Sequence, residues 1–140
     1  MKNLLTANLL KFTLSAIVLT ILFRIALSSF ITNKMIGALL ISAIAYGILM
    51  WISGYFFGKK DYENLPIHDV GFRFHLATFL AHNLISILWF TFGFQSKYED
   101  IGIIYLTAGI WGVFLLAHFI YYLSMRKSTV NNLGREDLFE

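Results

Sequence analysis

Four long stretches that are almost free of charged residues dominate the chain, at about residues 12–30, 36–57, 74–94 and 101–123. The hydrocarbon core of a bilayer is about 30 Å thick, and a helix of about 20 apolar residues spans it. Such a helix satisfies its own backbone hydrogen bonds where no water is available. With 58% hydrophobic and 14% charged residues, the composition also lies outside the usual range of soluble proteins. We therefore predict an all-α integral membrane protein, with a single membrane domain over residues 1–140.

The connections between the four stretches predict two antiparallel hairpins. The segment TNKM separates the first two stretches and QSKYED separates the last two, so each pair is joined by a short turn. A longer polar segment, residues 58–73, joins the two hairpins, and residues 124–140 form a polar tail. The predicted fold is a compact bundle of four transmembrane helices in contact with the lipid bilayer.

The lysine and arginine residues predict the orientation of the bundle. One side of the predicted membrane domain carries eight of them, namely Lys2, Lys11, Lys59, Lys60, Arg73, Arg126, Lys127 and Arg135. The other side carries only Lys34 and Lys97. Because basic residues are retained on the cytoplasmic side during insertion, we predict that both termini and the loop 58–73 are cytoplasmic. The very short outer turns favour a multi-pass protein of a bacterial inner (cytoplasmic) membrane.

The start of the chain has an alternative interpretation. Its basic first residues, an apolar run at 12–23 and the small residues ALS at 26–28 also fit a cleaved signal peptide. The apolar run resumes beyond Arg24, however, and a hairpin partner follows, so a transmembrane helix is favoured. An intact mass for a mature chain that begins near Ser29 would contradict four spans.

Small residues recur on the predicted helices at spacings that allow close packing. The first span has a row at intervals of four residues, formed by Ala16, Thr20, Arg24 and Ser28. The second contains Gly54 and Gly58 as G-x-x-x-G, and the fourth has Ala108 and Gly112 at the same separation. Such residues let helix backbones approach closely. We predict contacts within the bundle, with a homo-oligomer interface as the alternative.

Polar residues inside the predicted membrane mark a candidate site. The third span carries one stripe at helical spacing, formed by His75, Thr78, His82, Ser86 and Trp89, with Asn83 at its flank. In the fourth span, His118 lies at a similar depth to His82 from the same membrane boundary. The predicted intramembrane polar site consists of Arg24, Thr78, His82, Asn83, Ser86 and His118. The spacing leaves open whether His82 and His118 face each other.

Arg24 is the one charged residue within the predicted spans. It lies about 9 Å from the outer end of its span, so its long side chain is able to reach the headgroups. No acidic residue within any predicted span neutralises it. The simplest interpretation is therefore a side chain that extends to the membrane surface. The alternative is an inward-facing arginine that recognises an anionic ligand or restricts cations.

The polar stripe fits three functional classes. Histidines that exchange protons near neutral pH favour permeation or the binding of a small solute. The same groups could instead form hydrogen bonds between helices, as in an assembly or accessory subunit that binds a membrane partner protein or a second copy. In the third class, His82 and His118 are axial ligands of a b-type haem, whereas the main prediction includes no cofactor.

Enzymatic and nucleic-acid functions find little support in the sequence. It lacks the motifs of serine hydrolases, zinc proteases and phosphate-binding loops, and the absence of cysteine excludes thiolate chemistry. The net charge of +3 is dispersed among apolar runs, so no nucleic-acid partner is predicted. His68, Asp69 and His75 have the residue types of a zinc site at the membrane edge, but their spacing matches no compact motif and a fourth ligand is missing. The sequence favours a non-enzymatic membrane protein.

Overall fold

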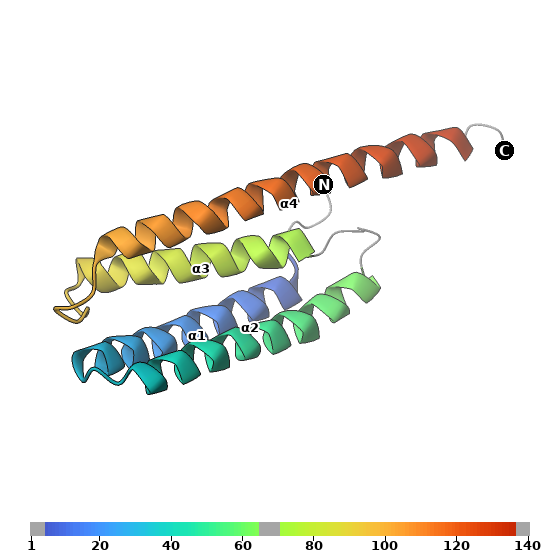
Figure 1. Ribbon diagram of the computed structural model, residues 1–140. Coiled ribbons are helices and arrows are strands. Elements are labelled where there is room, and N and C mark those ends of the chain that lie inside the picture. The colour runs from blue at the N-terminus through green and yellow to red at the C-terminus, as the bar shows by residue number, and fades with distance from the viewer. Residues whose placement is uncertain (1–4, 65–70, 137–140) are drawn as a thin grey trace.

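The computed structural model describes residues 5–64 and 71–136, with side chains described for 5–63 and 71–124. It contains four helices, α1 (Ala7–Thr32), α2 (Ile36–Asn64), α3 (Gly71–Thr91) and α4 (Ile101–Glu136), and no strand within the described residues (Figure 1). All four are long and apolar enough to cross a membrane. The predicted all-α bundle of two antiparallel hairpins is confirmed.

The helices extend beyond the apolar stretches that predict them. α1 begins at Ala7 rather than near residue 12, because the Thr6 hydroxyl caps it by accepting from the backbone N–H of Leu9. The backbone of α2 stays helical to Asn64, and that of α4 to Glu136. Apolar residues mark only the part of a helix that crosses the bilayer, and the helical backbone hydrogen bonds continue beyond that part.

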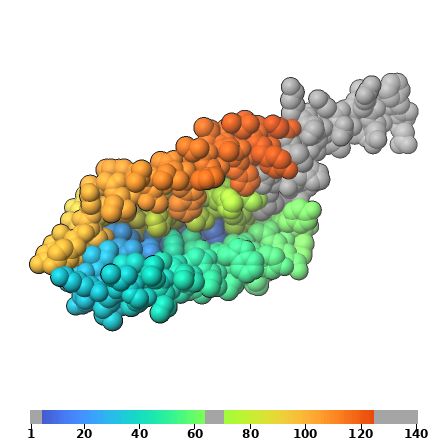
Figure 2. All heavy atoms as spheres, viewed as in Figure 1, coloured from blue at the N-terminus to red at the C-terminus, as the bar shows by residue number. Residues whose placement is uncertain are grey.

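The helices pack in the order α2, α1, α3, α4. α1 contacts both α2 and α3, whereas α4 packs on α3, and its described Cα atoms come no closer than 8 Å to those of α1 or α2. We call the end where α1 and α3 begin the inner end, and the end that holds the two hairpin turns the outer end (Figure 1). Figure 2 shows a hollow between α2 and α4, with α1 and α3 at its floor. The bundle is open along this side.

Many of the side chains inside the bundle are small or polar, whereas large apolar side chains are exposed on its surface. The row predicted from its four-residue spacing is the buried face of α1, since Ala16, Thr20, Arg24 and Ser28 are each at most 8% exposed. Large apolar side chains are instead exposed on α2 and α4, among them Ile41, Ile44, Ile103 and Leu106. Lipid solvates such side chains well, so the fold is arranged for a bilayer.

Phe12 fills the junction of α1, α2 and α3. It is 2% exposed, and its ring centroid lies 4.8 Å from that of Phe74. A Cβ atom placed on Gly54 would lie 3.6 Å from the Phe12 ring, at ordinary van der Waals distance, so α2 packs against Phe12 at this position. Gly58 and Gly112 face open space, because no described atom lies within 4 Å of the Cβ that either would carry. The G-x-x-x-G spacing therefore contributes one packing glycine and one that faces a hollow.

Candidate functional site

A buried ion pair joins α1 to the turn between α3 and α4. Arg24 Nη2 lies 2.7 Å from Glu99 Oε2, and the two side chains are 3% and 5% exposed. The other carboxylate oxygen accepts hydrogen bonds from Ser28 Oγ (2.6 Å) and from the backbone N–H of Ser96 (2.8 Å). The Glu99 carboxylate is thus held by three donors, which is how a charge is kept inside a membrane protein.

Aromatic rings complete the surroundings of this ion pair. The Arg24 guanidinium carbon lies 5.9 Å from the ring centroid of Trp89 and 5.5 Å from that of Phe90, within the range of cation–π attraction. Trp89 Nε1 donates to Ser28 Oγ over 3.0 Å, so the indole is fixed by the same serine that binds the carboxylate. These contacts close the outer part of the bundle.

The simplest interpretation of the sequence has the Arg24 side chain extend to the membrane surface, but in the structure it ends inside the bundle on Glu99 of the outer turn. Its side chain turns inward because Glu99, although outside the apolar spans, lies in a turn that folds back over the ends of the helices. The opposite charge and the further donors offset the cost of removing the guanidinium from water. Arg24 Nε still has no hydrogen-bond partner among the described residues.

A second set of polar contacts lies one helical turn further toward the middle of the bundle. Tyr46 Oη on α2 lies 3.0 Å from Thr20 Oγ1 on α1 and 3.1 Å from His82 Nδ1 on α3. Thr20 also donates to the carbonyl of Ala16. Tyr46 is held by stacking on Phe23, with ring centroids 4.5 Å apart. One tyrosine hydroxyl thus connects three helices, and His82 is part of that connection.

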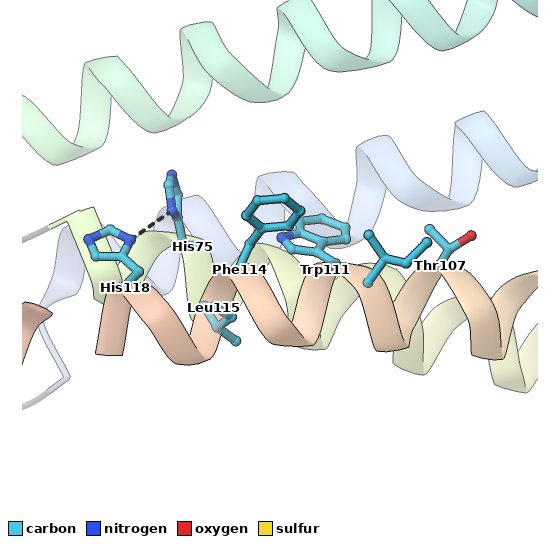
Figure 3. A pocket seen from close by; sticks show the side chains of 7 residues that line it. His75, Thr107, Trp111, Phe114, Leu115 and His118 are labelled. Carbon is cyan, nitrogen blue, oxygen red and sulfur yellow. Dashed lines mark hydrogen bonds between the residues drawn. The ribbon is translucent and has the colours of Figure 1, made fainter. Parts of the chain in front are cut away.

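The other histidine pair lies between α3 and α4. His75 Nδ1 and His118 Nδ1 are 3.2 Å apart, and the two rings are nearly perpendicular, at 79° (Figure 3). His118 therefore contacts His75, while His82 contacts Tyr46. The structure brings His82 and His118 to different partners rather than into one axial pair for a haem.

Two further members of the predicted polar site, Thr78 and Asn83, bond within their own helix. Thr78 Oγ1 donates to the carbonyl of Phe74, and Asn83 Nδ2 donates to the carbonyl of Phe79. Ser86 Oγ is fully buried and has no hydrogen-bond partner among the described residues. The predicted polar site is therefore divided into an ion-pair cluster, a tyrosine-centred cluster and a histidine pair.

The candidate metal site at the membrane edge is only partly within the described residues. His68 and Asp69 lie outside them, and His75 is paired with His118. Within residues 5–63 and 71–124, no group of three or more His, Asp or Glu side chains is placed to hold a metal ion. Two histidines supply fewer ligands than the three or four protein ligands typical of a zinc site.

Several polar residues that pack in the interior lie outside the site predicted from the sequence, among them Glu99, Tyr46 and Asp61. Glu99 binds Arg24, and Tyr46 belongs to the same polar core. Asp61 is buried near the inner end, where its carboxylate accepts from Asn8 Nδ2 (2.9 Å) and from Thr6 Oγ1. The position of Tyr46 is a usable signal, since tyrosine in the middle of a span is away from the interface where it is usually found. Glu99 and Asp61 carry no such signal, because acidic residues are common in membrane-edge segments.

The hollow between α2 and α4 contains two adjoining cavities, of about 560 and 680 Å³. They share His75 and Trp111, so we treat them as one groove and call it the lateral groove. Its wall on α4 includes Thr107, Trp111, Phe114 and His118 (Figure 3). Its wall on α2 includes Met50, Trp51, Gly54, Tyr55, Gly58 and Lys59. The lateral groove is mainly apolar and aromatic, with a few polar groups.

Comparisons with protein families, with curated proteins and with solved structures find nothing that matches this chain. The arrangement offers an aromatic groove, two paired histidines and a polar interior in which an ion pair and hydrogen bonds join the helices.

Proposed function

We propose that the protein is a non-enzymatic protein of the inner membrane that binds a small, largely apolar molecule in the lateral groove. The observation that carries this proposal is the pair of adjoining cavities, of about 560 and 680 Å³. Sites for small molecules typically measure about 300 to 1,000 Å³ and combine an apolar lining with a few polar groups that orient the ligand. His75, His118 and Thr78 would supply those polar groups.

The open side of the bundle supports entry of the ligand from the lipid. α4 packs only on α3 among the described helices, so the lateral groove opens between α2 and α4 along the helix axes. A molecule dissolved in the bilayer would reach Trp51 and Trp111 without crossing the polar interior. The aromatic lining favours a flat or cyclic apolar molecule, because stacked and edge-to-face ring contacts add to the effect of burial.

Permeation through the bundle is less well supported than binding. A path for an ion or solute would follow the buried row on α1, where Arg24 is paired with Glu99 and Thr20 with Tyr46. Opening this path would break an ion pair and several hydrogen bonds between helices. We assign these contacts to the stability of the bundle, and we place the inner end in the cytoplasm on the distribution of basic residues.

An assembly subunit is the second candidate function. Gly58 and Gly112 face open space, and exposed glycines let a helix of a partner protein approach closely. In this alternative the lateral groove receives a transmembrane helix instead of a small molecule. Cross-linking in native membranes distinguishes the two, since a partner helix gives a specific larger adduct and a small ligand does not.

Substitution of Gly58 by Trp is expected to block the lateral groove while the fold is kept, because no described atom lies within 4 Å of the added Cβ. The probe is N-phenyl-1-naphthylamine, whose fluorescence rises in apolar sites, titrated into the purified protein in detergent. We expect saturable binding to the unsubstituted protein and a loss of affinity of about tenfold or more in Gly58→Trp, equivalent to about 1.4 kcal/mol.

Gly47→Trp is the matched control. Gly47 lies on the same helix, also has no described atom within 4 Å of an added Cβ, and does not line either cavity. We expect this variant to bind the probe like the unsubstituted protein. Equal affinity in Gly58→Trp and Gly47→Trp, with helicity unchanged by circular dichroism, would reject the lateral groove as the binding site.

A further inference from the structure

A further cavity, of about 660 Å³, lies between α1, α3 and α4. Its lining includes Leu9 and Thr13 from α1, Arg73 and Leu80 from α3, and Phe119 and Tyr122 from α4. Along α3 it runs from Arg73 to Ile85, a distance of about 18 Å at the helical rise. None of its lining residues belongs to the lateral groove, so it is a separate site. We call it the Arg73 groove.

Arg73 is the exceptional residue of this groove. Its side chain is 8% exposed, and neither Nη1 nor Nη2 has a hydrogen-bond partner among the described residues. Arg24, the other buried arginine among the described residues, has a carboxylate 2.7 Å away. A buried charge without a partner is strongly unfavourable, and proteins normally pair it. The contrast points to an anion that belongs beside Arg73 and is not part of the described chain.

The rest of the Arg73 groove shows what kind of anion fits. Apart from Arg73, its lining residues are uncharged, and most of them are leucine, isoleucine, alanine or aromatic. Arg73 lies two residues after the start of α3 at Gly71, so it is at the inner end of the bundle, near the level of the headgroups. The apolar part of the groove continues from there toward the middle of the membrane. The matching molecule has one anionic group at the interface and a long hydrocarbon chain.

We propose that the Arg73 groove binds an anionic glycerophospholipid of the inner leaflet. Its phosphate is bound by the Arg73 guanidinium, whose two terminal nitrogens match two phosphate oxygens. One acyl chain lies along α3 between α1 and α4. Because α4 contacts only α3 among the described helices, this chain would also fill the space between α4 and α1 and so fasten α4 to the bundle.

The test measures the melting temperature of the delipidated protein in uncharged detergent, before and after addition of a lipid. The lipids are dioleoyl phosphatidylglycerol, dioleoyl phosphatidylcholine and oleate. We expect phosphatidylglycerol to raise the melting temperature of the unsubstituted protein by several degrees, and the other two to raise it less, since a ligand that binds only the folded state stabilises it. We expect Arg73→Leu to abolish this difference between lipids.

The melting temperature of each variant without lipid tests the role of Arg73 separately. If its charge lacks an internal partner, Arg73→Leu melts at the same or a higher temperature than the unsubstituted protein in detergent alone. Arg73→Lys, which keeps the charge but loses the paired donors, should retain part of the phosphatidylglycerol shift. Lys11→Gln, at an exposed lysine near the inner end, controls for general attraction of anions and should retain the whole shift.

Three results would overturn the proposal. The first is a phosphatidylglycerol shift in Arg73→Leu as large as that of the unsubstituted protein. The second is a clear loss of stability in Arg73→Leu without lipid, which would reveal a partner within the chain. The third is an equal shift from oleate, which would assign the groove to a fatty acid. Binding of the naphthylamine probe in the lateral groove is measured separately, so neither proposal depends on the other.

Discussion

Glu99→Gln is expected to destabilise the bundle by about 3 to 5 kcal/mol, because it leaves the Arg24 guanidinium buried without an opposite charge. Arg24 and Glu99 are 3% and 5% exposed, so water does not compensate for the loss. The free energy of unfolding is measured by titrating sodium dodecyl sulfate into the protein in mild detergent micelles and following helicity. Arg24→Met is expected to be destabilising for the same reason, since it isolates the carboxylate.

A double substitution separates the ion pair from other effects of these changes. In Arg24→Met with Glu99→Gln neither charge remains, so we expect the double variant to be more stable than Glu99→Gln alone. Lys97→Gln, in the same outer turn but exposed, should change the free energy of unfolding by less than about 0.5 kcal/mol. Additive losses in the double variant would show that Arg24 and Glu99 act independently, which would contradict the ion pair.

Phe12→Ala is expected to reduce the free energy of unfolding by about 3 kcal/mol, the lower part of the range for a buried phenylalanine. Phe12 lies where α1, α2 and α3 meet, against Phe74 and Gly54, so a cavity would form between three helices. The lower part of the range applies because lipid also solvates an exposed phenylalanine, and mainly packing contacts are lost.

Phe114→Ala is the control for this prediction. Phe114 is 71% exposed on α4, so its replacement should leave the stability nearly unchanged when measured by the same detergent titration. If the two alanine variants lost similar stability, Phe12 would not be the packing centre that joins the three helices.

The spans and the buried face of α1 could be predicted from the sequence, for clear physical reasons. A bilayer imposes a minimum length of apolar helix, so four uncharged stretches indicate four spans. The four-residue repeat of Ala16, Thr20, Arg24 and Ser28 defines one helix face, and small or polar residues favour contact with other helices over contact with lipid. Both predictions depend only on the spacing of residues along the chain and on the lipid that surrounds the helices.

The partners of the polar residues could not be predicted in the same way. Periodicity shows which face of a helix a residue occupies, but not which helix lies opposite, and so it left open whether His82 and His118 face each other. Glu99 lies outside the apolar spans, and only the folded outer turn brings it to Arg24. The lateral groove depends on α4 packing against a single helix, which no local pattern encodes.

The proposed function also explains why the polar groups are divided as they are. The ion pair and the tyrosine-centred cluster occupy the contacts among α1, α2, α3 and the outer turn, where they make the interior rigid. The paired histidines, by contrast, lie where the lateral groove passes between α3 and α4. A rigid core beside an open groove is the arrangement expected of a preformed binding site.

The most direct test of ligand binding in the lateral groove is photolabelling of the protein in native-like lipid, with a diazirine derivative of N-phenyl-1-naphthylamine, followed by peptide mass spectrometry. We expect saturable labelling of α2 around Trp51 to Lys59 and of α4 around Thr107 to His118, displaced by an excess of the unlabelled compound. Labelling spread evenly over the lipid-facing residues of all four helices, and unaffected by the competitor, would contradict a binding site between α2 and α4.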